Sequence, residues 1–287
     1  MDMFEEKFNS LFDKENKQAR VITLNNFKGG VGKTTLNSMI TYIATEVYGL
    51  RVLQIDSDPQ KNLTRKLYAT YKEAKEEAKE SITQAINKFD FKDSITKITD
   101  NLSIIEGSWE LAKLEQYILT NITTKNNAQY RLYQSMIEPL RSEYDLILFD
   151  GIPTTSIITS NCIIASDYVI VPTQADDDAY ENTVTYMNYL FSMADYNPKL
   201  EIIGIVPYLV TNDTTDIGIL EKYRSEFPET TYQNIIKRSA KVKTWSGSGI
   251  TRNKPYDKVT LKMYDKVFRE TIERIYAIEN DTELELE

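Results

Sequence analysis

Residues 25–35 read NNFKGGVGKTT, and this glycine-rich stretch decides the fold. It ends a β-branched run at residues 21–26 and precedes a helix-like segment that extends to about Val47. At such a junction the helix N-terminus presents unpaired amides and the positive end of its dipole to an anion. Glycines let the backbone wrap closely around phosphate oxygens, where a Cβ atom would collide. The stretch therefore predicts a phosphate-binding loop.

Individual side chains of this loop have distinct predicted roles. Lys33 supplies a point charge to the β- and γ-phosphates, and the Thr34 hydroxyl is placed to ligate Mg²⁺. Thr35 lies just behind, near the α-phosphate. The strict pattern GxxxxGK[ST] fails at its first position, because Phe27 stands where glycine is expected. Lys28 is a further lysine that the ordinary loop lacks.

Two apolar runs end in acids. Residues 52–60 read VLQIDSDPQ, and residues 146–150 read LILFD. A carboxylate at a strand end that faces the γ-phosphate can polarise water without histidine. Asp150 would hold Mg²⁺ directly or through water. Taken alone, each run has a plainer interpretation, because Asp and Pro are common turn formers and buried strands often end in Asp.

The order of the segments predicts the fold class. The chain has 287 residues and is 41% hydrophobic, which is enough for a sizeable core. Apolar strands alternate with helix-like stretches, and this pattern implies a parallel sheet covered on both faces. We expect one doubly wound α/β domain of the P-loop NTPase type. The predicted strands are residues 21–26, 51–56, 102–106, 145–149, 168–172 and 202–210.

The rest of the chain predicts further segments. Residues 1–19 form a helical extension with Phe4, Phe8, Leu11 and Phe12 at helical spacing, residues 20–279 form the ATPase domain, and residues 280–287 form an acidic tail. Residues 72–80 predict a solvated helix with i,i+4 Glu–Lys pairs.

Composition excludes several classes of function. The chain has no histidine, which removes His-based acid–base catalysis and His-ligated zinc. Cys162 is its one cysteine, so an internal disulfide and CxxC metal ligation are excluded. The N-terminus lacks the basic and apolar regions of a signal peptide. The longest apolar run is residues 202–210, whereas a membrane span needs about 20 residues. We therefore expect a cytoplasmic protein without a membrane partner.

Charge is distributed unevenly along an acidic chain. The net charge is −9, yet residues 237–262 hold eight basic residues and one acid, a net +7 that leaves −16 for the remainder. The window also contains Trp245 and a predicted loop at residues 246–249. It can be a basic solvated face that balances the protein, or a surface that contacts DNA phosphates without reading sequence. The candidate DNA-contacting residues are Lys241, Lys243, Arg252, Lys254, Lys258 and Lys262.

The motif KGGVGKTT resembles the deviant Walker A motif of the ParA/MinD superfamily, and IDSDPQ at residues 55–60 looks like that family's next conserved segment. The resemblance implies that Lys28 reaches across a dimer interface to the partner's nucleotide and that Asp58 orients the attacking water. Its implied catalytic residues are thus Lys28, Lys33 and Asp58, with Thr34 and Asp150 for the metal. The implied nucleotide contacts are Lys28, Gly29, Gly30, Val31, Gly32, Lys33, Thr34 and Thr35.

Segments near residues 206–210, 233–239 and 256–258 are most similar to the delta-type ParA ATPases of Gram-positive plasmids. This resemblance implies an ATP- and Mg²⁺-dependent partition ATPase, weak when alone. Its ATP-bound homodimer would coat nucleoid DNA, and a small ribbon-helix-helix, ParB-like centromere-binding protein would stimulate hydrolysis. The competing hypotheses are a MinD-like positioning protein that never touches DNA and a metabolic ATPase or kinase. An acidic C-terminal segment argues against a MinD-type membrane helix.

Overall fold

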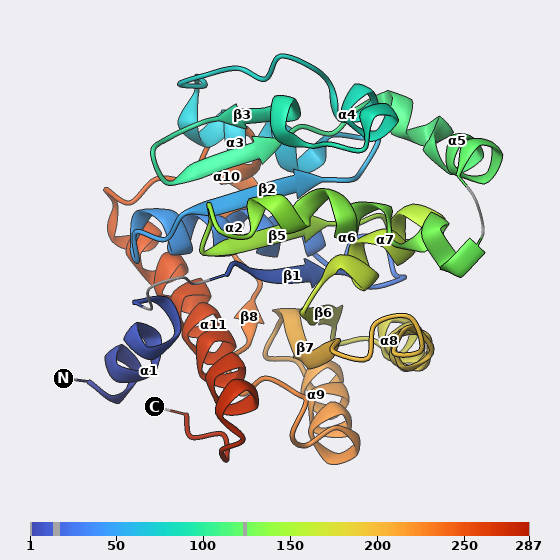
Figure 1. Ribbon diagram of the computed structural model, residues 1–287. Coiled ribbons are helices and arrows are strands. Elements are labelled where there is room, and N and C mark those ends of the chain that lie inside the picture. The colour runs from blue at the N-terminus through green and yellow to red at the C-terminus, as the bar shows by residue number, and fades with distance from the viewer. Residues whose placement is uncertain (1, 14–17, 123–124, 287) are drawn as a thin grey trace.

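The computed structural model describes residues 2–13, 18–122 and 125–286 (Figure 1). The described residues form one eight-stranded sheet in the order β3-β4-β2-β5-β1-β6-β7-β8. Strands β3 and β4 pair antiparallel, and every other neighbouring pair is parallel. The predicted fold class, a doubly wound and mostly parallel α/β sheet, is therefore confirmed.

The elements follow one another along the chain as predicted for such a fold. The strands are β1 (Arg20–Leu24), β2 (Val52–Asp56), β3 (Ile95–Lys97), β4 (Leu102–Ile105), β5 (Leu146–Asp150), β6 (Tyr168–Gln174), β7 (Glu201–Val210) and β8 (Ile236–Lys237). The α-helices are α1 (Met3–Phe12), α2 (Lys33–Glu46), α3 (Asn62–Tyr71), α4 (Ile82–Lys88), α5 (Leu114–Asn121), α6 (Leu132–Ile137), α7 (Ile157–Ala165), α8 (Asp177–Met193), α9 (Thr214–Glu226), α10 (Ala240–Ser248) and α11 (Pro255–Asn280). Short 3₁₀ helices are η1 (Lys92–Ser94), η2 (Trp109–Lys113), η3 (Lys125–Tyr130) and η4 (Glu138–Leu140).

Helices cover both faces of the sheet because its strands are apolar on both sides. Val21 of β1 packs with α6 and α7 on one face, whereas Ile22 and Leu24 pack with α2 and α11 on the other. This alternation follows the two-residue period of a strand. Helices α1, α2, α3, α10 and α11 lie on one side, and α4 to α9 lie on the other (Figure 1).

The prediction of a helix at residues 72–80 is wrong. Helix α3 ends at Tyr71, and Lys72 takes a left-handed φ of 71°. The segment then runs beside β3, where the Lys75 and Glu76 amides donate to the Lys97 carbonyl. Its lysines pair across segments, for example Lys75 with Asp100 at 2.6 Å. Pairs at i,i+4 contribute only ~0.2–0.5 kcal/mol each, too little to hold a helix against these contacts.

Other boundaries also differ from the sequence predictions. Residues 246–248 belong to α10 rather than to a loop, and strands β3 and β8 were not predicted. The N-terminal helix ends at Phe12 instead of residue 19, while residues 14–17 lie outside the described part of the chain. Its apolar face behaves as expected, since Phe4, Leu11 and Phe12 are buried in the core that α11 shares.

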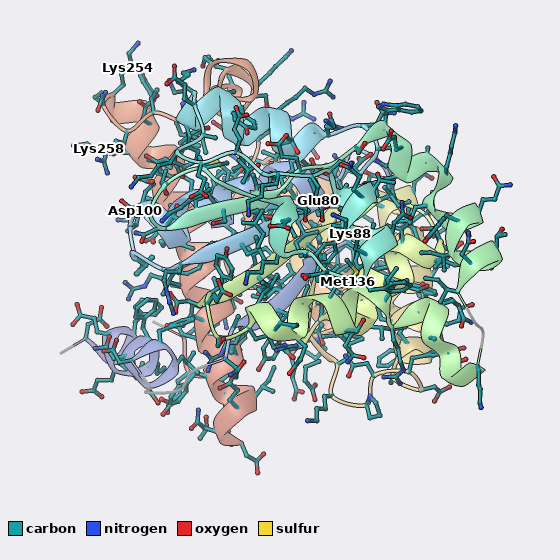
Figure 2. The ribbon with its side chains drawn as sticks, turned by 45° about the horizontal axis from the view of Figure 1, so that its top comes forward. Glu80, Lys88, Asp100, Met136, Lys254 and Lys258 are labelled. Atoms are coloured by element: carbon teal, nitrogen blue, oxygen red, sulfur yellow. The ribbon has the colours of Figure 1, made fainter. Side chains whose placement is uncertain are left out.

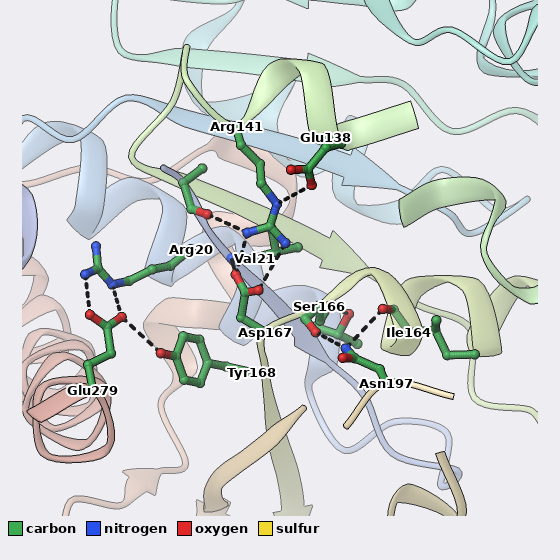
Figure 3. A network of polar contacts seen from close by, with 12 residues as sticks. Arg20, Val21, Glu138, Arg141, Ile164, Ser166, Asp167, Tyr168, Asn197 and Glu279 are labelled. Carbon is green, nitrogen blue, oxygen red and sulfur yellow. Dashed lines mark hydrogen bonds and ion pairs between the residues drawn. The ribbon is translucent and has the colours of Figure 1, made fainter. Parts of the chain in front are cut away.

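A polar network fastens the amino ends of the central strands (Figure 3). The Asp167 carboxylate accepts hydrogen bonds from the Val21 amide at 2.8 Å and from the Arg141 guanidinium at 2.8 and 3.0 Å. The same guanidinium donates to the Ala19 carbonyl. On the neighbouring side Arg20 pairs with Glu279 of α11. The opposite edge, where the parallel strands end, carries the loops with the predicted phosphate and carboxylate residues.

Candidate nucleotide-binding site

The loop between β1 and α2 is anchored by the Asn26 side chain and depends on two glycines for its backbone conformation. The Asn26 side-chain amide anchors it by donating to the Pro172 carbonyl and the Thr183 hydroxyl, each at 3.0 Å. Gly30 and Gly32 have φ angles of 80° and 89°, in the left-handed region that favours glycine. A Cβ atom on Gly32 would lie 2.1 Å from the Tyr208 ring. The glycines at these two positions are therefore required by the backbone.

The start of α2 differs from those of α7, α8 and α9. Helices α7, α8 and α9 begin at Ser156, Asp176 and Asp213, whose side chains accept hydrogen bonds from first-turn amides. Helix α2 begins at Gly32, which has no side chain to cap it. Its first amides are thus free to bind an anion, as the sequence predicted for this junction.

Lys33 is placed inside the loop. Its side chain is 7% exposed, and its ammonium donates to the Lys28 carbonyl at 2.9 Å. Burial lowers the pKa of Lys33 to about 8, although the nearby carboxylates of Asp150 and Asp58 partly oppose this shift. A phosphate that took the place of the Lys28 carbonyl would stabilise the protonated form of Lys33, because its negative charge would face the ammonium.

Asp150 has the features of a cation ligand. Both of its carboxylate oxygens are buried, and neither accepts a hydrogen bond from the residues that the structure describes. Burial, followed by the facing Asp56 carboxylate, raises the pKa of Asp150 well above its usual value, and the adjacent Thr34 hydroxyl opposes this. Mg²⁺ commonly takes one or two protein oxygens and completes its shell with phosphates and waters. Thr34 and Asp150 therefore fit the metal that the sequence predicted for them.

Asp58 lies on the loop after β2, at the same edge of the sheet. Its carboxylate accepts from the Gln60 amide at 2.8 Å and is partly exposed. Asp56 holds this loop in place: it is fully buried and accepts from the Asp58 amide and from the amide and hydroxyl of Thr64. Burial raises the pKa of Asp56. The arrangement leaves Asp58 accessible while Asp56 supports the backbone.

Lys28 points away from the loop interior. Its ammonium forms an ion pair with Asp176 at 2.5 Å, and its side chain is 24% exposed. Asp176 is also the residue that caps α8, through the Ala179 amide. The two lysines of the motif therefore have separate environments, one inside the loop and one at its rim.

Sequence reasoning missed several residues of this site. Asp56 was noted only as part of a motif. A buried acid at the end of a strand is a signal that its carboxylate accepts hydrogen bonds from the following loop and holds that loop in place. Asp176 and Gln174 could not be found, because they reach the loop from β6 and α8, about 145 residues further along the chain. Gln174 donates to the Gly30 carbonyl at 2.9 Å.

All but one of the candidate DNA-contacting residues in the basic window are exposed. Lys241 is withdrawn from it, because its ammonium lies 2.7 Å from the carboxylate of the fully buried Asp257. Trp245 is buried beside this pair. The other candidates are exposed around α10 and the start of α11, and Lys254 and Lys258 project from the body of the molecule (Figure 2). These exposed candidates are Lys243, Arg252, Lys254, Lys258 and Lys262.

A phosphate-binding loop and two acid-ended strands meet at the carboxyl edge of a parallel sheet, and together they define a P-loop nucleotide-binding protein. None of the described helices is both long and apolar enough to cross a membrane.

Comparisons with known proteins agree with this class. A family profile described as "AAA domain" matches residues 19–202. The Thermus thermophilus chromosome-partitioning ATPase Soj is 30% identical over 78% of this chain and 84% of its own length. The Bacillus subtilis sporulation initiation inhibitor protein Soj is 28% identical over 78% of this chain and 86% of its own. A plasmid partition protein from Borrelia burgdorferi shares the fold, with a TM-score of 0.64 at 22% identity over 86% of this chain and 99% of that protein.

The chain belongs to the ParA/MinD superfamily, within its partition ATPases. The resemblance noted in the sequence is thereby confirmed at the level of the family, and an ATPase activity follows in general terms.

Proposed function

We propose that this protein is a plasmid partition ATPase of the delta type, which binds Mg²⁺·ATP and forms a homodimer around two nucleotides. The observation that carries the proposal is the separation of the two lysines. Lys33 lies inside the loop, where it can contact the chain's own nucleotide. Lys28 lies at the rim, where its ammonium forms an ion pair with Asp176. A lysine at that position is available to a nucleotide bound by a second chain.

Hydrolysis in this proposal depends on residues of the phosphate loop and of the two strands that end in acids. The amides of Gly29 to Thr35 and the Lys33 ammonium hold the phosphates and offset their charge. Thr34 and Asp150 hold Mg²⁺, which screens the β- and γ-phosphate oxygens when bound. Asp58 accepts a hydrogen bond from the attacking water and orients it. Asp58 is partly exposed in the single chain, so turnover is slow until a partner closes the site.

The proposed cycle connects this site to DNA. The exposed cations of the basic window contact DNA phosphates without reading bases. Dimerisation doubles that surface and raises its affinity through effective concentration. A ribbon-helix-helix centromere-binding protein then stimulates hydrolysis, and the dimer leaves the nucleoid. A MinD-like protein that dimerises without binding DNA is the alternative.

Charge reversal tests the DNA assignment. The double variant Arg252→Glu/Lys258→Glu removes four positive charges from the proposed dimer surface, and we expect at least tenfold weaker ATP-dependent retention on nonspecific DNA at low salt. The matched control is Lys92→Glu/Lys199→Glu, which makes the same charge change at exposed positions outside the window. Lys241 is not used, because its loss would leave buried Asp257 without its ion pair. Unchanged retention with intact ATP-dependent dimerisation would favour the MinD-like alternative.

A further inference from the structure

An open groove lies where β8 meets the first half of α11. It has a volume of about 560 Å³. Its apolar part includes Tyr256 and Val259, which are 80% and 71% exposed, together with Ile235 and Met263. Large apolar side chains that are this exposed and contiguous indicate a binding surface.

The rim of the groove is positively charged. Lys237, Arg238, Lys262 and Lys266 line it, and none of its lining residues is acidic. Among the described residues, the side chains of Arg238, Lys262 and Lys266 have no hydrogen-bond or ion-pair partner. Phosphate contact alone would not require the apolar floor. The groove therefore fits a segment that carries both acids and bulky apolar side chains.

The chain itself contains such a segment. Residues 281–287 read DTELELE, and an extended conformation places Leu284 and Leu286 on one face and the glutamates on the other. The tail is lightly held in the structure. Lys7 donates to the Glu285 carbonyl at 2.9 Å, and its ammonium lies 3.9 Å from the Glu285 carboxylate, whose side chain is 70% exposed. The Lys7 side chain is 11% exposed, so the contact of the tail with it consists of one hydrogen bond and one long ion pair.

The leucines of the tail cannot reach the exposed apolar floor of the groove, at Tyr256 and Val259, in their own chain. Val259 and Asn280 lie on the same helix, α11, and 21 residues of α-helix span about 32 Å. The six described tail residues reach at most about 20 Å when extended. We propose that the groove binds the acidic tail of a second copy, with its leucines on the apolar floor and its glutamates toward the basic rim. Such a head-to-tail contact is heterologous and builds rings or open chains.

A peptide experiment tests the contact directly and does not depend on the partition function. A labelled peptide with the sequence of residues 280–287 is titrated against the full chain, and we expect saturable binding that weakens with salt. Val259→Asp and Lys266→Glu should each weaken it at least fivefold, whereas Lys199→Glu should have no effect. A peptide with both leucines changed to serine keeps the charge and should bind at least tenfold more weakly.

Three results of the peptide titrations would overturn the proposal. They are no saturable binding up to millimolar peptide, equal affinity of the serine peptide, or unchanged affinity of the Val259→Asp protein. In the full chain, the apparent mass measured by light scattering at low salt should rise with protein concentration. Leu284→Ser/Leu286→Ser should abolish this rise. A rise that persists in the variant would also overturn the proposal. Leu284→Ser/Leu286→Ser lies outside the nucleotide site and the basic window and changes no charge, so it should retain ATP hydrolysis and DNA binding, and a failure of the partition assignment would be distinguishable.

Discussion

Lys33 makes nucleotide binding sensitive to alkaline pH. Its pKa is about 8 in the free protein because the side chain is buried, and bound phosphates would raise that pKa. ATP binding at pH 8.5 should therefore take up roughly three-quarters of a proton, since the free lysine would be mostly neutral there. Affinity should fall as pH rises from 8 toward 10. Calorimetry in two buffers of different ionisation enthalpy measures this uptake.

The control for this prediction is Lys33→Arg, whose side chain stays protonated throughout. It should show no uptake linked to that position. Equal proton uptake in both proteins would assign the effect to another group.

In the proposed dimer, the ion pair with Asp176 would compete with the contact of Lys28 to a second chain. Asp176→Asn weakens the ion pair but keeps an effective cap for α8, because Asn caps helices as well as Asp does. We expect ATP-dependent dimerisation to become severalfold tighter, and Lys28→Ala to abolish it. Sedimentation velocity with a nonhydrolysable ATP analogue measures both. Dimerisation that is unaffected by Lys28→Ala would contradict the proposed role of this lysine.

At the scale of elements, α10 packs closely against α3. Gly249 ends α10 with a φ of 85°, and a Cβ atom there would lie 2.1 Å from the Ala69 carbonyl oxygen. The Thr70 hydroxyl accepts from the Ile250 amide, and Lys66 donates to Ser246 at 2.7 Å. Gly249→Ala should therefore lower the free energy of unfolding by ~1–3 kcal/mol in urea denaturation.

Gly247, two residues earlier in α10, provides the matched control. A Cβ atom there meets nothing within 4 Å, and helix propensity favours alanine over glycine. Gly247→Ala should leave stability unchanged or raise it by up to ~1 kcal/mol. Equal losses in the two variants would mean that α10 itself, not its contact with α3, determines the result.

The elements also indicate what sequence could predict. Periodicity located the six long parallel strands and α2 because their apolar residues repeat locally. It failed at residues 72–80, where cross-segment pairs to Lys97 and Asp100 replaced the helical ones. It also missed β3 and β8, which are only three and two residues long. The phosphate loop was predictable because its residues are contiguous, whereas the supports from Gln174 and Asp176 depend on tertiary folding.

Over the whole molecule, a positive patch on an acidic protein predicts a strong dependence on salt. Five exposed cations per chain give at most ten phosphate contacts in a dimer. The logarithm of the DNA association constant should fall with the logarithm of salt concentration with a slope between roughly −5 and −9 in ATP. Fluorescence anisotropy between about 50 and about 300 mM salt measures this slope. A slope near zero would contradict the assignment of these exposed cations to DNA binding.

The network around Asp167 has a mechanical consequence. It joins β1, the segment before β6 and Arg141 at the amino ends of the strands (Figure 3). A five-residue strand extends about 17 Å from that anchored end. The Asp167 carboxylate thus ties the amino end of β1 and the start of β6 to one arginine, whereas the loops that carry Lys28 and Asp58 leave the sheet at its opposite edge.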